Sequence, residues 1–231
     1  MFSWMKVVRC LISRRIKRIM SLKIRNVTLS SLIQRECYKW VFANNVLYDL
    51  CTEHPEHNDK DCIVAKIWLI GRAYAAAIER RQNNDGIDTD KFYYNVVAPE
   101  MLKIGKKLDE RIENIKTFPS INIDNLPYIL KTHNMLMSLF YKLTQLEKRS
   151  LASKYLHFHC PNGFYIYDSR ANSAIKKIIK KDRETPVVED GNYDKEYKEF
   201  CLRMLELQNY ITEETGEIPT PRKLDSFLLG Y

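Results

Sequence analysis

The sequence contains few of the residues that interrupt regular secondary structure, with 7 glycines and 8 prolines in 231 residues. This scarcity argues against low-complexity sequence and against a β-sandwich, which needs a turn after every short strand. The six cysteines lie far apart and form no CxxC pair, so neither a zinc knuckle nor a small disulfide scaffold is predicted. We expect reduced thiols that are mostly buried.

Signatures of several enzyme classes are also absent. The chain has no Walker loop, GxGxxG, HExxH or GxSxG, which argues against the commoner nucleotide-binding, zinc-protease and serine-hydrolase classes. Lysines and arginines interrupt every apolar run in residues 1–20 before it reaches the length of a signal peptide or a membrane span. We therefore expect a cytoplasmic protein that does not enter a membrane.

Positive charge is concentrated in two parts of the chain, whose formal net charge is +8. Residues 1–25 contain eight lysines and arginines and no acid, and residues 142–181 contain nine basic and two acidic residues. The rest of the chain is net acidic, and a basic segment on an acidic body indicates a polyanionic partner. A solvated lysine-rich helix face would produce the same pattern. Residues 1–25 are interpreted as a basic N-terminal extension: an amphipathic helix on a membrane surface or nucleic acid, or a start-site artefact ahead of Met20.

Apolar residues recur with helical spacing, and no convincing run of alternating strands is present. We predict an all-α fold of about eight helices in two packed lobes with a cleft between them, and residues 26–231 as a single domain. The second helix is expected to include Ala75–Ala77 in close packing and to end at Arg80 and Arg81. Residues 88–90 are acidic enough to cap the next helix, and Pro99 is expected to start a separate helix rather than to interrupt that one. The expected helices cover about 30–53, 61–82, 99 onward, 126–147, 150–159, 169–181, 194–214 and the residues after Pro221.

The segment from Ser150 to Ala171 has a distinctive order of elements. A helix is followed by the turn Pro161-Asn162-Gly163, by the short extended piece Phe164–Tyr167, and by Asp168, which opens the next helix. This order resembles the active-site segment of the helix-hairpin-helix DNA glycosylases, in which an aspartate at the start of a helix follows a hydrophobic FPxxD piece and faces the DNA. The resemblance covers about twenty residues directly and implies an 8-oxoguanine-glycosylase-like fold. The segment is also similar to bacterial relatives of the 8-oxoguanine glycosylases that occur among antiviral defence genes.

The resemblance implies a catalytic role for Asp168. Hydrolysis of an N-glycosidic bond gives the sugar oxocarbenium character, and a carboxylate beside the anomeric carbon stabilises that charge and orients or deprotonates a water molecule. Asp168 is equally suited to be a helix N-cap, and both roles can coexist. Bifunctional members of the family carry a lysine nucleophile upstream, but the position 18 residues before Asp168 is Ser150. The chain therefore resembles the single-function enzymes, and Lys154 is a candidate for either a substitute nucleophile or a phosphate contact.

The resemblance also predicts residues that hold the DNA. The family hairpin is glycine-rich so that its backbone N–H groups grip a phosphate, whereas residues 145–150 contain no glycine. We expect charge to compensate, and the predicted DNA-binding residues are Lys148, Arg149, Ser150, Ser169 and Arg170.

A glycosylase rotates its target base into a pocket that stacks against it and forms hydrogen bonds with it. The predicted pocket residues are Trp68, Arg72, Tyr74, Tyr165 and Tyr167. For the four aromatic side chains the alternative is an ordinary aromatic core, and for Arg72 it is a buried ion pair.

A metal site is not expected. His157 and His159 are two apart on a helix and point to different sides, so with Cys160 they are interpreted as structural residues. We predict a glycosylase without metal or organic cofactor, acting hydrolytically on a modified or damaged base in double-stranded DNA and without an obligate protein partner. The resemblance implies phage DNA with modified bases as one such substrate. The alternatives are a non-catalytic helical nucleic-acid-binding protein, and a partner-binding or toxin–antitoxin component.

Overall fold

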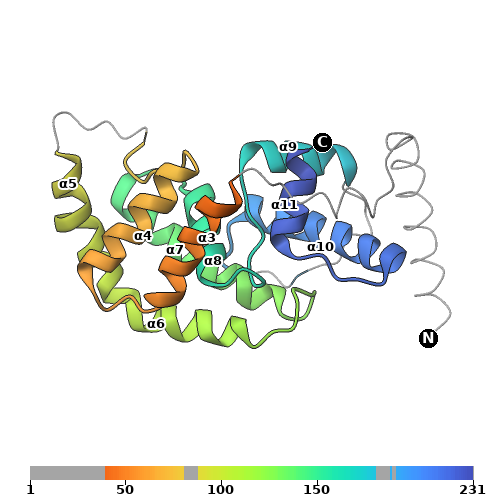
Figure 1. Cartoon of the computed structure of the whole chain (residues 1–231), viewed down its shortest axis with the longest axis horizontal. Coiled ribbons are helices and arrows are strands. Elements are labelled where there is room, and N and C mark those ends of the chain that lie inside the picture. The colour runs from red at the N-terminus through yellow and green to blue at the C-terminus, as the bar shows by residue number, and fades with distance from the viewer. Residues whose placement is uncertain (1–39, 81–87, 181–187, 189–190, 231) are drawn as a thin grey trace.

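A computed structural model describes residues 40–80, 88–180, 188 and 191–230 (Figure 1). These residues form helices and no strand, which confirms the all-α prediction. The predicted extension, residues 1–25, lies outside the described residues. The elements are α3 (Val41–Glu53), α4 (Lys60–Ala73), α5 (Thr89–Phe92), η1 (Tyr93–Val97), α6 (Ala98–Lys116), α7 (Leu126–Thr144), α8 (Arg149–His159), α9 (Ser169–Ile178), α10 (Lys195–Thr215) and α11 (Pro221–Leu229).

Helix α8 is the centre of the fold. Every residue from Leu151 to His159 is buried, and α3, α4 and α7 all pack against this helix. The apolar residues of α8 fill the core, but four polar side chains are buried with them, Ser153, Lys154, His157 and His159. Buried polar groups need hydrogen-bond partners, so the segments that pack around α8 must supply polar atoms to these four side chains.

Helices α9, α10 and α11 lie together at one end of the molecule, and α4, α5 and α6 lie toward the other end (Figure 1). Helix α9 packs against both α10 and α11. The buried segment Phe164–Tyr167 connects α8 to α9, with the predicted turn at Pro161–Gly163 before it. The start of α9 is thereby fixed against the side of α8.

The predicted end of the second helix was wrong. Helix α4 ends at Ala73, and Ala75 has a positive φ of 50°. The chain folds back so closely that a Cβ atom on Gly71 would lie 3.0 Å from the Cα of Ala77. The alanine run therefore forms a turn against the end of α4, because this close contact outweighs the helical propensity of alanine.

The prediction that Pro99 starts a separate helix is confirmed only in part: α6 begins at Ala98 with Pro99 in its first turn, but the preceding helix runs directly into it. Helix α5 continues through the π-helical turn η1 into α6, and the N–H of Ala98 bonds to the carbonyl of Tyr93 five residues earlier. Proline has no N–H to donate, and the wider turn before Pro99 lets the chain pass it without ending the helical run. With this run counted once, the described residues contain eight helical segments.

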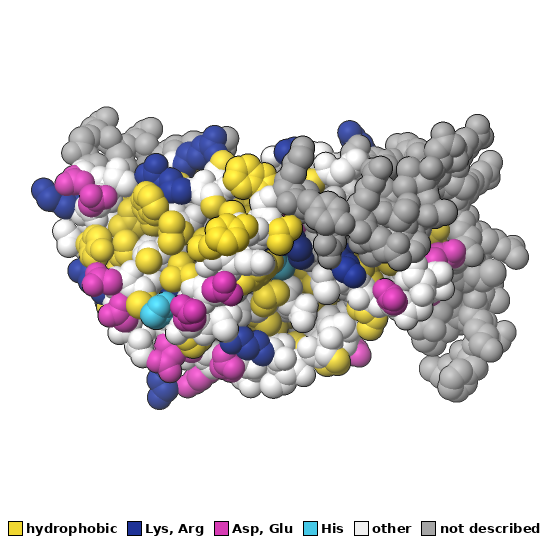
Figure 2. Space-filling model, in the orientation of Figure 1, with side chains coloured by type: hydrophobic (Ala, Val, Ile, Leu, Met, Phe, Trp, Pro, Cys, Tyr) yellow, Lys and Arg dark blue, Asp and Glu magenta, His cyan; other side chains and the backbone are white. Residues whose placement is uncertain are grey.

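The described surface on one face carries exposed hydrophobic side chains over α3 and α4, with basic and acidic side chains mixed around them (Figure 2). Among the described helices, none has the length and apolar character needed to cross a membrane.

Candidate functional site

A buried lysine lies at the centre of the candidate site. The side chain of Lys154 in α8 is 3% exposed, and its Nζ donates a 2.8 Å hydrogen bond to Oγ of Ser150 and lies 3.6 Å from Oδ2 of Asp168. The same Nζ lies 5.5 Å from the centroid of the Tyr74 ring. Burial lowers the pKa of Lys154, and the charges of Asp168 and Asp225 act in the opposite direction. A buried lysine with a lowered pKa is a better nucleophile at neutral pH than a surface lysine, because more of it is uncharged.

Asp168 joins this lysine to the start of α9. Its Oδ1 accepts a 2.8 Å hydrogen bond from the N–H of Ala171, so the predicted N-cap is confirmed. Its other oxygen faces Lys154, and the side chain is 27% exposed. The capping bond and the positive end of the helix dipole both stabilise a negative charge at this position. The structure therefore shows a carboxylate that is in contact with solvent on one side and with a buried ammonium on the other.

Ser153, which directly precedes Lys154 in α8, restricts the position of the Asp168 carboxylate. Oγ of Ser153 accepts a 3.0 Å hydrogen bond from the N–H of Tyr167 and lies 3.3 Å from the Tyr167 carbonyl oxygen. Ser153 is completely buried. The residue immediately before Asp168 is thus held against α8, which limits how far Asp168 can move from Lys154.

The sequence analysis missed the contribution of α11. The guanidinium carbon of Arg222 lies 5.6–5.8 Å from the ring centroids of Tyr48, Tyr74 and Phe158. Its Nε donates a 3.0 Å hydrogen bond to the Tyr48 hydroxyl. Stacking of this kind suits the planar guanidinium group. Arg222 therefore connects α3, α8 and the turn after α4 through one side chain.

The Tyr48 hydroxyl, which accepts from Arg222, also forms a hydrogen bond with a histidine of α8. Tyr48 and Nε2 of His157 are 2.7 Å apart, and Nδ1 of His157 lies 3.0 Å from the Phe164 carbonyl. A carbonyl only accepts, so Nδ1 carries the hydrogen and Nε2 accepts from Tyr48. Burial lowers the pKa of His157 to about 3, which keeps the ring neutral. The structural role expected for His157 agrees with this arrangement.

Asp225 is the second carboxylate near Lys154. It is 3% exposed, and its Oδ2 lies 3.3 Å from Nη1 of Arg222, while Oδ1 is buried without a hydrogen-bond partner among the described residues. Burial raises the pKa of Asp225 to about 6, although Arg222 opposes this. The available signal was an aspartate between Leu224 and Phe227 on the apolar side of a short amphipathic helix.

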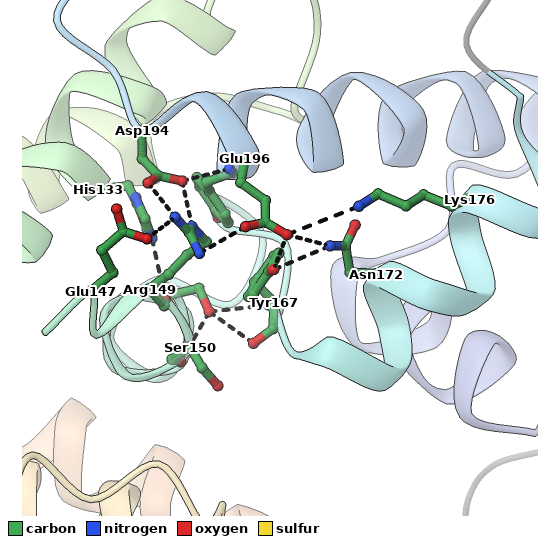
Figure 3. A network of polar contacts seen from close by, with 11 residues as sticks. His133, Glu147, Arg149, Ser150, Tyr167, Asn172, Lys176, Asp194 and Glu196 are labelled. Carbon is green, nitrogen blue, oxygen red and sulfur yellow. Dashed lines mark hydrogen bonds and ion pairs between the residues drawn. The ribbon is translucent and has the colours of Figure 1, made fainter. Parts of the chain in front are cut away.

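Arg149 belongs to a separate network (Figure 3). Its side chain is 12% exposed and contacts three carboxylates: Asp194 at 2.5 and 2.7 Å, Glu147 at 2.9 Å and Glu196 at 3.0 Å. These contacts tie the start of α8 to the start of α10. They occupy the guanidinium group, so the structure does not favour Arg149 as a phosphate contact.

Of the other predicted DNA-binding residues, two form hydrogen bonds within the protein and two are exposed. The Nζ of Lys148 donates a 2.6 Å hydrogen bond to the Arg80 carbonyl, and Ser150 accepts from Lys154. Ser169 and Arg170 are exposed in the first turn of α9, directly after Asp168. Of the predicted set, these last two have the accessibility that a DNA contact needs.

Only one predicted pocket residue, Tyr74, lies at the Lys154–Asp168 pair. Tyr165 and Tyr167 are buried, and their hydroxyls donate to Gln208 and Glu196 at 2.8 Å, which fits the aromatic-core alternative. Arg72 is half-exposed, pairs with Glu79 at 2.5 Å and stacks on Trp68. A hollow of about 1100 Å³ is lined by Tyr48, Phe158 and residues of α6, and neither Lys154 nor Asp168 is among its lining residues.

Histidines and cysteines do not gather into a metal site in the part of the chain that the structure describes. His159 instead bonds through Nδ1 to the Tyr155 carbonyl at 2.9 Å and stacks on His57. Comparison with known proteins gave no match, whether with protein families, curated proteins or solved structures.

Proposed function

We propose that the protein is a DNA glycosylase that removes a modified or damaged base from double-stranded DNA and leaves an abasic site. The observation that carries the proposal is the Lys154–Asp168 pair at the start of α9, with a 3.6 Å separation between Nζ and Oδ2. The resemblance of residues 150–171 to the helix-hairpin-helix glycosylases adds support. A setting in antiviral defence, with a modified phage base as substrate, and the glycosylase-like fold rest on that resemblance alone. The proposed cytoplasmic setting rests on the charges that interrupt every apolar run in residues 1–20, and the cleft between two lobes stays a prediction.

The partial exposure of Asp168 suits contact with a sugar. A carboxylate beside the anomeric carbon stabilises the positive charge that develops as the glycosidic bond breaks. Lys154 lies behind this carboxylate, with its Nζ 3.6 Å from Oδ2. In the hydrolytic route Asp168 orients the attacking water, and Ser150 at the family lysine position agrees with that route. Tyr74, whose ring centroid lies 5.5 Å from Nζ of Lys154, and Arg222 and Tyr48, which contact each other beside Tyr74, are the proposed surroundings of the extruded base.

Abasic-site formation tests the proposal directly. Duplexes carrying ordinary, damaged or phage-type modified bases would be incubated with the full-length protein, treated with alkali and resolved by size. We expect alkali-dependent breaks at one class of base. Intact DNA on every substrate, together with retained DNA binding, would contradict the proposal and favour the non-catalytic nucleic-acid-binding alternative.

Helix α9 provides the surface proposed to hold DNA. Arg170, Lys176 and Lys177 are exposed along it, downstream of Asp168, and Lys180 is exposed two residues after its end. Lys176 lies 3.9 Å from Glu196, so the charges of Lys177 and Lys180 are the better test. Phosphate contacts release counterions, which makes binding weaken as salt increases.

Replacing both Lys177 and Lys180 with alanine is expected to reduce the slope of log affinity against log salt by about 2, since each phosphate contact contributes about 0.9. Fluorescence anisotropy with a labelled duplex at several salt concentrations measures this slope. Lys106 and Lys107, exposed on α6, provide a matched double alanine control with no expected change. Equal slopes for the two double variants would show that α9 does not contact DNA. Salt-insensitive binding to a protein would favour the partner-binding alternative.

A further inference from the structure

The hollow lined by Tyr48, Phe158 and α6 has the size and construction of a small-molecule site. Its volume of about 1100 Å³ is just above the range of about 300–1000 Å³ that is typical of such sites. Its exposed lining residues lie on α6 and after the ends of α3 and α8, so the hollow opens to solvent. Its buried lining residues are Cys51 from α3 and Phe158, His159 and Cys160 from the end of α8.

A buried lysine holds the loop between α3 and α4, which forms one side of the hollow. Lys66 in α4 is 0% exposed, and its Nζ donates to the carbonyls of His54 and Glu56 at 2.7 and 2.9 Å. His57 of the same loop packs so closely on α6 that a Cβ atom on Gly105 would overlap the His57 carbonyl oxygen. This side of the hollow is therefore formed without a ligand, which lowers the entropic cost of binding one.

Two stacked histidines, His57 and His159, differ in how their ring nitrogens are satisfied. Nδ1 of His57 contacts Asp109, which also accepts from the His57 backbone N–H at 3.0 Å, and Nε2 of His57 lies 2.7 Å from the Tyr155 hydroxyl. Nε2 of His159, by contrast, is buried without a hydrogen-bond partner in the part of the chain that the structure describes. A buried polar atom of this kind is unfavourable unless a molecule outside the chain supplies the partner.

The unpartnered nitrogen of His159 is a hydrogen-bond acceptor. Nδ1 of His159 lies 2.9 Å from the Tyr155 carbonyl, which only accepts, so Nδ1 carries the hydrogen and Nε2 has a lone pair. Burial lowers the pKa of His159, which keeps the ring neutral at pH 7. Because Nδ1 and the ring face against His57 are occupied, the Nε2 edge is the part of this lining residue that is left for a bound molecule.

The charges around the hollow favour a cation. Tyr48 and Phe158 add flat apolar surface to the lining, and Lys116 pairs with Glu113 at 2.7 Å. A ligand that suits these surroundings has a flat apolar body, a positive charge and an N–H donor. The formal net charge of the lining is −2, with four acidic and two basic residues, Glu56, Asp109, Glu110, Glu113, Lys106 and Lys116.

We propose that this hollow binds a small organic cation whose N–H group donates a hydrogen bond to Nε2 of His159, while the carboxylates of α6 balance its charge. Protonated amines, amidines and guanidines belong to this chemical class. Lys154 and Asp168 are not among the lining residues, so the inference does not depend on the glycosylase proposal.

Nitrogen-15 NMR of the full-length protein tests the hydrogen bond at the proposed atom. Protein labelled at its histidine ring nitrogens would be titrated at pH 7 with benzamidine or 2-phenylethylamine, and the spectrum of His159→Phe identifies the His159 signals. We expect a saturable upfield shift of Nε2, because an unprotonated ring nitrogen moves upfield when it accepts a hydrogen bond. His133 is the internal control, since its Nδ1 is also buried without a partner among the described residues but does not line the hollow.

Calorimetric titration measures the contribution of charge to the affinity. Benzamidine is expected to bind at least about tenfold more tightly than benzamide or benzoate, which have nearly the same shape without a positive charge. Glu110→Gln is expected to weaken benzamidine binding about two- to fivefold, as for an exposed ion pair. Glu213→Gln makes the same change at an exposed position of α10 outside the hollow and is expected to have no effect.

The same titration measures the contribution of the histidine. His159→Phe keeps an aromatic ring but removes the acceptor, and it is expected to weaken benzamidine binding at least about tenfold. A thermal melt establishes that the variant is folded.

The inference is overturned if neither cation shifts Nε2 of His159, or if benzamide or benzoate binds as tightly as benzamidine. Wild-type affinity in folded His159→Phe also overturns it. None of these measurements involves base excision, so their failure leaves the glycosylase proposal standing, and a protein that excises no base can still show this site.

Discussion

Asp168→Asn is expected to lower base excision by at least about 100-fold, because the variant has no negative charge to stabilise the sugar cation. Asparagine is also a good N-cap, so the N–H of Ala171 keeps its acceptor and α9 keeps its start. The loss is therefore expected in the rate, and a thermal melt establishes that the variant stays folded without the charge that faces Lys154. Single-turnover formation of abasic sites, on the base that the wild type removes, measures the change.

The chain offers a matched control for this substitution. Asp59 caps α4 by accepting from the N–H of Cys62 at 2.7 Å, and it is exposed and far from Lys154 in the sequence. Asp59→Asn makes the same chemical change at the same kind of helix position, and excision is expected to be unchanged. If Asp168→Asn retains the wild-type rate while excision is measurable, Asp168 is only a cap.

Arg149→Met is expected to lower the free energy of unfolding by about 3–5 kcal/mol, the usual cost of removing one partner from a buried ion pair. Asp194 is 5% exposed at its side chain and would be left without its two contacts to Arg149, although it would still accept from the N–H of Tyr197. Urea denaturation at pH 7 measures the change. Arg72→Met, which removes a half-exposed partner of Glu79, is the control and is expected to cost less than about 1 kcal/mol.

The pH dependence of the unfolding free energy tests whether the loss in Arg149→Met comes from its ion pair with Asp194. Burial alone would raise the pKa of Asp194, but the hydrogen bonds from Arg149 and Tyr197 outweigh it and the pKa is lowered from 3.8. A lowered folded-state pKa means that the stabilisation is present above pH 3.8 and is lost as the pH falls through the lowered value. The difference between wild type and Arg149→Met should therefore shrink in acid. A difference below about 1 kcal/mol at pH 7 would contradict a buried network.

Local sequence predicted the order of elements around the candidate site. The turn after α8, the extended segment and the cap at Asp168 depend on residues close together in the chain, and all three are confirmed. The C-terminal end of α4 and the path of the chain past Pro99 depend on contacts and backbone geometry that local sequence does not show. The first is determined by the close contact between Gly71 and Ala77, and the second by a π-helical turn that periodicity does not reveal.

The tertiary part of the site was not accessible to the same reasoning. Arg222 and Asp225 come from the last helix, far along the chain from Lys154, and no spacing rule connects them. The basic character of Arg149 predicted a phosphate contact, but its three carboxylate partners are Glu147 nearby and Asp194 and Glu196 more than forty residues away. Charge in a sequence does not show whether another part of the fold neutralises it.

The hydrogen bond between Arg222 and Tyr48 joins residues that are 174 positions apart. During synthesis, the surroundings of Lys154 are therefore incomplete until α11 has left the ribosome and packed against α3. Until α11 docks, Tyr48 and Tyr74 lack the guanidinium group that packs on them, and Lys154 lacks one of its two nearby negative charges. The chemistry proposed for this site consequently becomes available only after α11 has docked, and loss of this helix would remove it.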